Sequence, residues 1–529
     1  MKRLVTAEEM RGMDHEAIAV RGIPGYELME AAGRGVAETI LGHFHDLEDA
    51  PVVVLAGRGN NGGDGFVAAR VLKERGLRPL VILVGARPEE LAGDAATAYG
   101  DWTAARGETL IASDGAGWED ARREMEDADL IVDALLGTGS RGAPRGLLAQ
   151  VVEELELLDT PIAAVDIPTG LDADTGEAEG ACVHADLTVT MALPKRGHFL
   201  YPGRSFVGEL RWVDIGIPED VLEGGAGLRP YVVEPEDVVD RLPDREPEMH
   251  KGDRGRLLVV GGSAGLTGAV ALASQAAVRA GAGLVTAGVP LSLNDILEAK
   301  LTEAMTLPLP ELEARALARD AFDAIALFQP GRLTALAVGP GAGRHPGTQA
   351  LVRRIVQEIH LPTLLDADGL FAFNGQADLL RQGDAATQLV LTPHAGEFLA
   401  LTGEDPAELH AHRFEVASKW ARRLNAVLVL KGAPTVIADP ASESVFVNPT
   451  GSEALATGGT GDVLSGFIAG FLAQGVDPLD AAVAGVYLHG WTADFIVEEW
   501  GSVYGLQAGD LVEWFPLALG YFLNPPQEE

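Results

Sequence analysis

The feature that most constrains the fold is a pattern repeated along the whole chain. A short apolar run ends in glycine or a polar residue, and a segment with helical periodicity follows. Such runs occupy residues 51–56, 130–132, 161–165, 257–260 and 335–338. Short, fully apolar runs are typical of strands buried on both faces, and strands that alternate with helices form parallel sheets. The sequence therefore predicts an α/β protein whose sheets are covered by helices on both sides.

The length of the chain predicts more than one domain. At 529 residues it exceeds the size at which single hydrophobic cores stop growing, about 250–300 residues. Residues 222–230 lose periodicity and are rich in glycine, which is typical of a linker. We therefore expect two three-layer α/β/α domains, residues 1–224 and residues 232–525.

Composition excludes several classes of protein. The net charge of −38, from 78 acidic and 40 basic residues, argues against nucleic-acid binding through a general basic surface. The single cysteine, Cys182, excludes an intramolecular disulfide and a cysteine-rich zinc site. The basic N-terminus has no apolar segment behind it, and no apolar stretch is long enough to span a bilayer. We expect a cytoplasmic protein that binds neither nucleic acid nor membranes.

The first half begins with a strand, a glycine-rich segment and a helix, the order that a nucleotide-binding turn requires. The strand of residues 51–56 leads into the glycine-rich loop of residues 57–65, which fits the pattern G-x-G-x-x-G. The next strand lacks the acidic residue that a dinucleotide dehydrogenase presents to the ribose. Asn60, Asn61 and Asp64 instead offer oxygens that can coordinate a hard cation or contact ribose hydroxyls.

Polar side chains end three further strands of this half. Asp133 and Asp166 each follow an apolar run directly, and Lys195 ends a third run. Because the carboxyl ends of parallel strands open into one crevice, we expect these side chains beside the glycine-rich loop. A single aspartate at a strand end is often a helix cap, but two of them near an asparagine-rich loop favour a ligand site.

The second half is organised around residues 458–462, Gly-Gly-Thr-Gly-Asp, with an apolar helix directly behind them. Backbone amides at a helix N-terminus suit a phosphate or a developing negative charge. A carboxylate there needs a role, and removal of a proton from an attacking hydroxyl would give Asp462 one. The alternative is a glycine-rich turn in which Asp462 only caps the helix. Asp366 and Asp368 end another strand, where they could hold magnesium with its water shell.

A serine hydrolase is a further alternative. Residues 261–265, Gly-Gly-Ser-Ala-Gly, fit the nucleophile-elbow pattern and follow a strand. A hydrolase also needs a histidine and an acid, and no feature of the sequence pairs His394 with Ser263. We therefore favour a turn of small residues that lets a substrate approach the backbone.

Several motifs of the first half resemble the NAD(P)H-hydrate epimerase domain over about residues 1–220. They are residues 6–14, 28–33, 59–65 (Gly-Asn-Asn-Gly-Gly-Asp-Gly), 166–170 (Asp-Ile-Pro-Thr-Gly) and 194–195. The resemblance implies a Rossmann-like domain and a potassium ion held by Asn61, Asp133 and Thr169. It implies that the hydrated dinucleotide binds to Asn60, Asn61, Gly62, Gly63, Asp64, Gly137, Thr138, Gly139, Ser140, Arg141, Gly142, Ala143 and Asp166. Asp166 is also our candidate for proton transfer at the epimerising centre.

Motifs of the second half resemble the ribokinase-like superfamily, and within it the ADP-dependent NAD(P)H-hydrate dehydratases, over about residues 232–519. They are residues 391–398, 428–433 and the Gly-Thr-Gly-Asp segment, in the family's order. The resemblance implies a catalytic Asp462 and a substrate site that includes Ala269, Gly341, Gly343, His394 and Asp462. It implies that ADP binds to Lys431, Gly432, Ala433, Pro434, Thr435, Ser452, Glu453, Ala454, Leu455, Ala456, Thr457, Gly458, Gly459, Thr460 and Gly461.

Together the two resemblances imply a bifunctional repair enzyme for hydrated nicotinamide cofactors, NADHX and NADPHX. It would epimerise the R and S hydrates and dehydrate the S form with ADP, giving NAD(P)H, AMP and phosphate, with K⁺ and Mg²⁺ as metal ions. We expect a homo-oligomer. The alternatives are a ribokinase-like kinase of a small alcohol, and a first domain that binds dinucleotides without catalysing a reaction.

Overall fold

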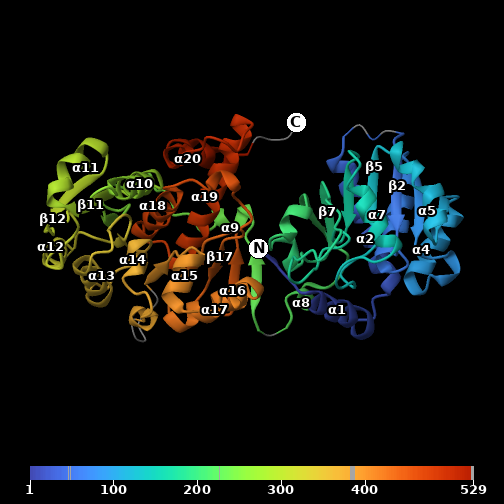
Figure 1. Ribbon diagram of the computed structural model, residues 1–529, viewed down its shortest axis with the longest axis horizontal. Coiled ribbons are helices and arrows are strands. Elements are labelled where there is room, and N and C mark those ends of the chain that lie inside the picture. Colours follow the sequence, from blue (N-terminus) through green and yellow to red (C-terminus); the bar gives the residue numbers. More distant parts are fainter. Residues whose placement is uncertain (46, 48, 226, 330, 382–387, 526–529) are drawn as a thin grey trace. The chain divides into compact units, whose positions relative to one another are not determined.

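Two sheets organise the chain (Figure 1), and the chain divides into two compact units: residues 2–226, and residues 227–529 together with Met1. The division lies inside the glycine-rich stretch of residues 222–230. The computed structural model describes all residues except 46, 48, 226, 330, 382–387 and 526–529.

The sheet of the first unit is parallel throughout, with the strand order β4-β3-β2-β5-β6-β7-β8. Its strands are β2 (Pro51–Ala56), β3 (Arg78–Val84), β4 (Glu108–Ala112), β5 (Leu130–Ala134), β6 (Ile162–Val165), β7 (Leu187–Met191) and β8 (Glu209–Val213). The short β1 (Lys2–Arg3) is not a strand of this sheet. The chain builds outward from β2 in one direction and then from β5 in the other. The carboxyl ends of β2 and β5 therefore form the topological switch point, where ligands bind in open α/β sheets.

Helices cover both faces of this sheet because its strands are apolar on both sides. Val52 and Val54 of β2 share a core with α1–α4, whereas Val53 and Leu55 share another with α5–α7. The helices are α1 (Ala7–His15), a π-helical turn (Glu16–Val20), α2 (Gly25–His43), α3 (Asn60–Glu74), α4 (Gly93–Ala104), α5 (Gly115–Ala121), α6 (Arg123–Glu126), α7 (Leu147–Leu155) and α8 (Glu219–Leu222). This is a three-layer α/β/α unit.

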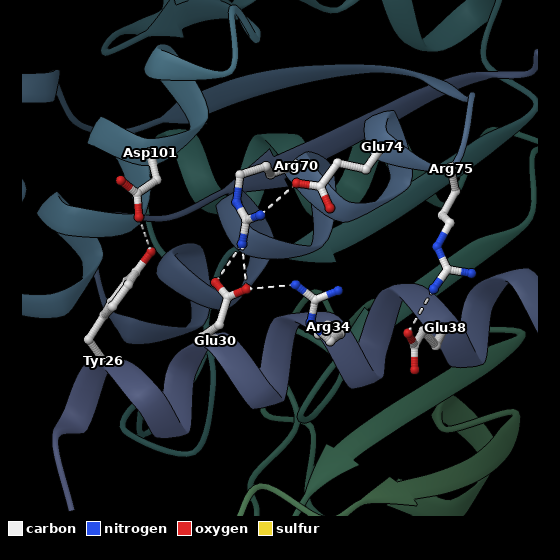
Figure 2. A network of polar contacts seen from close by, with 8 residues as sticks. All are labelled: Tyr26, Glu30, Arg34, Glu38, Arg70, Glu74, Arg75 and Asp101. Carbon is white, nitrogen blue, oxygen red and sulfur yellow. Dashed lines mark hydrogen bonds and ion pairs between the residues drawn. The ribbon is translucent and has the colours of Figure 1, made fainter.

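Polar contacts join α2 to α3 and α4 on the outer side of these helices (Figure 2). Glu30 of α2 accepts from Arg70 of α3 at 2.6 Å, and Arg70 also reaches Glu74 at 2.7 Å. Tyr26 of α2 donates to Asp101 of α4 at 2.5 Å. Exposed pairs of this kind each stabilise a fold only slightly. One of these contacts, Glu30–Arg70, joins α2 to α3, the helix that carries Asn60, Asn61 and Asp64.

The sheet of the second unit has the strand order β9-β18-β17-β16-β15-β14-β13-β10-β11-β12. The strands from β16 to β12 in this order run parallel, and β17 is antiparallel to both of its neighbours. Their bounds are β9 (Arg229–Val232), β10 (Arg256–Val260), β11 (Leu284–Pro290), β12 (Met305–Leu309), β13 (Ala335–Val338), β14 (Thr363–Leu365), β15 (Leu389–Leu391), β16 (Val427–Leu430), β17 (Val436–Ala438) and β18 (Ser444–Val447).

Helices again form two outer layers. The main core joins α10, α18, α19 and α20 to one face of the sheet, and α13, α15 and α17 lie on the opposite side in Figure 1. The helices are α9 (Pro235–Val239), α10 (Thr267–Arg279), α11 (Asn294–Lys300), α12 (Ala321–Phe328), α13 (Pro346–Glu358), α14 (Asp368–Phe371), α15 (Ala395–Thr402), α16 (Pro406–Ala411), α17 (Arg413–Leu424), α18 (Thr460–Ala473), α19 (Pro478–Trp500) and α20 (Ala508–Leu523). The predicted fold class, two three-layer α/β/α domains, is confirmed.

One local expectation is wrong. The glycine-rich loop ends at Gly59, and residues 60–65 already belong to α3. A Cβ on Gly62 would lie 1.9 Å from the Gly57 carbonyl oxygen, and a Cβ on Gly63 would lie 2.6 Å from Met29. These glycines therefore let the first turn of α3 pack closely against its surroundings. Among the described residues, none of the helices combines the length and apolar character needed to cross a membrane.

Candidate functional site

A cavity of about 690 Å³ opens at the topological switch point of the first unit. Its wall includes Asn60, Asn61 and Asp64 of α3, residues 137–140 after β5, and Asp166 and Lys195 after β6 and β7. Of the three strand-end residues that the sequence singled out, Asp166 and Lys195 therefore line one cavity, and Asp133 is not part of its wall.

Asp166 and Lys195 form a buried ion pair in this cavity. The Lys195 Nζ lies 2.5 Å from Asp166 Oδ1 and donates to the Thr190 hydroxyl at 2.7 Å, while Thr190 donates to Asp166 at 2.9 Å. Asp166 has φ +67°, a left-handed conformation that is costly for a non-glycine residue and is found mostly at functional sites. Burial opposes ionisation of Asp166, but the Lys195 ammonium outweighs it and lowers the pKa of Asp166. Asp166 is therefore a carboxylate at neutral pH.

Two other carboxyl groups of the cavity behave in the opposite way. Burial, together with the negative charge of Asp166, raises the pKa of Asp64 well above its usual range, and burial raises the pKa of Asp14. Acids and bases whose environments separate their pKa values mark sites of proton transfer. Asp14 was missed as a site residue, although it ends a segment, residues 6–14, that stands out in the sequence.

Asp133 is fully buried, and its carboxylate accepts from the amide of Leu135, a residue of the cavity wall. It accepts from the Thr169 amide and hydroxyl, both at 2.8 Å, and from the Leu135 amide at 3.2 Å, which are neutral donors. Burial raises the pKa of Asp133 to about 6 despite these hydrogen bonds. The Asn61 side chain, 9% exposed, has an amide nitrogen without a hydrogen-bond partner among the described residues. A buried carboxylate with oxygen-bearing neighbours fits a monovalent cation.

The structure separates the remaining predicted residues of the first site. Gly142 lines a second, smaller cavity of about 210 Å³, on whose wall Gly137 and Ser140 also lie. Arg141 is exposed, and Ala143 packs against Gly180. Residues 137–140 therefore form a partition between the two cavities.

The second site lies at the carboxyl edge of the other parallel sheet. Gly459, with φ +98°, precedes α18, so Gly461 and Asp462 stand in the first turn of that helix. Thr460 donates its hydroxyl to the carbonyls of Leu455 and Thr457 at 2.9 and 3.0 Å. This contact fixes the predicted nucleotide wall, residues 452–461, to the helix that carries Asp462.

Lys431 pairs with Asp366 in this site. Lys431 Nζ lies 2.9 Å from one Asp366 oxygen, and the Ser465 hydroxyl donates to the other at 2.7 Å. A Cβ on Gly461 would lie 3.6 Å from Lys431 Nζ, so the ammonium faces the start of α18. Ser465, which the sequence analysis did not single out, lies three residues after Asp462, and that helical spacing could have identified it.

Asp462 keeps no direct cation partner among the described residues. Burial raises the pKa of Asp462 to about 7, and the negative charges of Asp366 and Asp368 add to this effect while Lys431 opposes it. His489 of α19 contacts the Thr460 carbonyl at 3.0 Å, and burial lowers the pKa of this histidine to about 4. Asp462 therefore has the proton affinity of a general base that works near neutral pH.

Other predicted residues surround this centre. His394 is 61% exposed and caps α15, accepting from the Glu397 amide, and it pairs with Lys431 in a parallel β-bridge. A Cβ on Gly341 would lie 3.1 Å from Ala269, and Gly343 donates its amide to Asp368.

The contacts of Ser263 argue against the hydrolase alternative. Ser263 is buried, and its hydroxyl donates to the Gly341 carbonyl at 2.9 Å. The hydroxyl is thus engaged by the backbone of the turn, as a packing role for this serine requires.

Comparison with known proteins separates the same two halves. Residues 25–197 match the family described as YjeF-related protein N-terminus, and residues 257–516 match the family described as NAD(P)H-hydrate dehydratase. A crystal structure of ADP/ATP-dependent NAD(P)H-hydrate dehydratase from Bacillus subtilis, co-crystallised with ATP/Mg²⁺, is 34% identical with a TM-score of 0.47. It aligns with 55% of this chain and 97% of that chain.

Full-length relatives are also found. A bifunctional NAD(P)H-hydrate repair enzyme of Moorella thermoacetica is 44% identical, over 98% of this chain and 96% of the relative. One from Salinibacter ruber is 40% identical, over 97% of this chain and 95% of the relative. The alignment thus runs through both units, and the chain belongs to the family of bifunctional NAD(P)H-hydrate repair enzymes.

Proposed function

We propose that this chain repairs hydrated NADH and NADPH through two separate activities. Residues 2–226 interconvert the R and S hydrates, and residues 227–529 use ADP to dehydrate the S form, giving NAD(P)H, AMP and phosphate. The observation that carries the proposal is the presence of two carboxyl-edge sites, each with a buried lysine–aspartate pair, in a chain that aligns throughout with bifunctional repair enzymes.

The second site suits phosphoryl transfer followed by elimination. Asp462 accepts the proton of the hydrate hydroxyl, whose oxygen attacks the terminal phosphorus of ADP as the bond to AMP breaks. The amides at the start of α18 and the Lys431 ammonium stabilise the phosphoryl charge. The carbon–oxygen bond of the phosphate ester then breaks, phosphate leaves, and loss of a proton from the adjacent carbon restores the ring double bond. In this chemistry, positioning and electrostatics supply most of the rate enhancement.

The first site suits proton transfer at the hydrated ring. Asp166, held as a carboxylate by Lys195, accepts a proton, and Asp64, whose pKa is raised, donates one. Both carboxyl groups line the same cavity, so a hydrate bound there would meet both a base and an acid.

Two metal ions complete the proposal. Asn61, Asp133 and Thr169 would hold K⁺, which would supply the positive charge that the buried Asp133 carboxylate otherwise lacks. The carboxylates of Asp366 and Asp368 are already engaged by Lys431, Ser465, Gly343 and Arg344, so Mg²⁺ would enter with the phosphates of ADP. The homo-oligomer stays a prediction, which light scattering of the purified protein would check.

The decisive experiment supplies the full-length protein with a mixture of both NADH-hydrate epimers, K⁺, Mg²⁺ and either ADP or ATP. NADH absorbance and chromatography of the two epimers are followed together. We expect recovery of NADH from both epimers. If NADH were recovered only from the S hydrate, the first unit would be a binding module without epimerase activity. If a phosphorylated alcohol accumulated and no NADH formed, the kinase alternative would be favoured.

A further inference from the structure

On the wall of the first cavity, the acidic side chains are more buried than the arginines. Its carboxyl groups are Asp14, Asp64, Asp94 and Asp166, all at least partly buried. Its cations are Lys195, which is buried and held by Asp166, and two arginines, Arg11 and Arg58, which are exposed. The acidic groups thus lie deeper and the arginines lie at the solvent side.

Arg11 and Arg58 come from different elements that border the cavity. Arg11 is on α1, three residues before Asp14, and Arg58 stands between Gly57 and Gly59 immediately before α3. Within the described part of the chain, neither guanidinium has an ion-pair or hydrogen-bond partner. By contrast, Arg21, Arg70 and Arg75 of the same unit are all paired with carboxylates. The two arginines of the cavity are therefore available for an incoming anion.

The proposed substrate needs such a partner. A hydrated reduced nicotinamide ring is uncharged, whereas the pyrophosphate of the dinucleotide carries two negative charges. The protein has a net charge of −38, and the cavity wall carries more carboxyl groups than cations. Lys195, the cation in the depth of the cavity, is already paired with Asp166. Among the described residues of the wall, the cations left for a pyrophosphate are therefore the two arginines at the solvent side.

We propose that Arg11 and Arg58 bind the pyrophosphate of the hydrated dinucleotide at the solvent side of the cavity, which directs the uncharged ring toward Asp166. This inference rests on the proposed epimerase function. Guanidinium groups suit the role because they remain charged and present several donors to phosphate oxygens at once.

The test uses the full-length chain with Arg11→Gln, Arg58→Gln and the double substitution. Arg123→Gln, an exposed arginine of α6 outside this cavity, is the matched control. Epimerisation is measured with the hydrates of NADH, NADPH and reduced nicotinamide riboside, the last of which lacks phosphate. Inorganic pyrophosphate serves as a competing probe, and ADP-dependent dehydration of the S hydrate checks that each variant is intact.

We expect each substitution to raise KM for NADH hydrate about tenfold or more, the size of a lost charge-assisted hydrogen bond. KM for NADPH hydrate should rise similarly, and KM for the riboside hydrate should not change. Pyrophosphate should inhibit the native chain and lose potency in the variants. Added salt should weaken dinucleotide binding to the native chain more than to the double variant.

Several outcomes would overturn the inference. One is an equal rise in KM for the riboside and dinucleotide hydrates, since the arginines would then act without phosphate. A rise confined to NADPH hydrate would assign them to the additional phosphate instead, and unchanged constants would remove them from the site. A native chain that epimerises no hydrate would contradict the proposed function itself, a result distinguishable from all of these.

Discussion

The two sites use the same buried pair of residue types for opposite purposes. In the first unit, Lys195 lies 2.5 Å from Asp166, the candidate proton acceptor, and lowers its pKa. In the second unit, Lys431 lies 2.9 Å from Asp366, while the candidate base, Asp462, has a pKa of about 7. One aspartate is thus held ionised by its lysine. The other keeps a high proton affinity because it is buried and lies near the negative charge of Asp366, while Lys431, which is paired with Asp366, opposes this effect only in part.

This contrast teaches that a lysine near a catalytic aspartate does not by itself define how the aspartate titrates. Asp366 is held by Lys431 and by the Ser465 hydroxyl, and its charge acts on Asp462 through space. Burial raises the pKa of Asp462 most, and the charge of the third group, Asp366, adds to that effect.

Asp462→Asn should abolish dehydration and leave epimerisation intact. Loss of a general base costs about 10²–10⁴ in rate. Recovery of NADH from pure S hydrate with ADP measures the first activity, and interconversion of the two epimers measures the second. An equal loss of both activities would show that the two sites do not work separately.

Lys195→Met should remove the ion pair with Asp166 and so destabilise the first unit, without affecting the second site. Removing one partner of a buried pair costs about 3–5 kcal/mol, because the remaining charge has no counterion. The pKa of Asp166 is lowered in the folded protein, so the pair stabilises at neutral pH and its contribution is lost as pH falls through that pKa. Hydrogen exchange of β7 should therefore accelerate in the variant at neutral pH more than at acid pH.

Lys73→Met is the matched control, because this exposed lysine of the same unit donates to the Ala105 carbonyl. Dehydration should be retained in both lysine variants. Unchanged exchange of β7 in Lys195→Met would contradict a stabilising role for the buried pair.

The pH dependence of the two activities should differ. Dehydration should rise with pH through about 7 as Asp462 loses its proton, whereas epimerisation should show no such rise because Asp166 is already ionised. Initial rates at saturating ADP, between pH 5 and pH 9, measure both. If the rates of both activities changed with pH in the same way, the proposed difference between Asp462 and Asp166 would be contradicted.

The same shift affects stability with the opposite sign. The folded pKa of Asp462 lies above its ordinary value of 3.8, so the folded state binds more protons between that value and about 7. Stability from this group should fall as pH rises through that window. Asp462→Asn should therefore raise the thermal midpoint at pH 8 and leave it unchanged at pH 3.

Ser465→Ala should have the smallest effect. The hydroxyl orients Asp366, and loss of a hydrogen bond to a charged group costs about 1.5–3 kcal/mol at most. We expect dehydration to fall about tenfold and epimerisation to stay unchanged. Ser274→Ala is the control, because this buried serine of α10 donates only to the Val270 carbonyl of its own helix. Ser465→Thr should restore most of the activity, and equal effects in both alanine variants would reduce Ser465 to a packing residue.

Much of the fold was predictable because it follows from local pattern. Fully apolar runs such as residues 51–56 became strands with cores on both faces, since alternate side chains must be buried on each side. Glycines at the strand ends marked the carboxyl edges, and Asp166 and Lys195 were expected in one crevice because parallel strands end at the same edge. The start of α3 was misplaced, because glycines that usually signal a loop serve close packing there.

The sequence by itself determined the strand ends, the start of α18, and which residue types lie at each edge. Only the tertiary structure decided which lysine serves which aspartate. Lys431 and Asp366 are separated by 65 residues, and Ser465 and Asp366 by 99. The reason is physical: proton affinity depends on burial and on charges a few ångströms away, and those charges come from different strands and helices. The same residue pattern could have given Asp462 a lysine partner of its own.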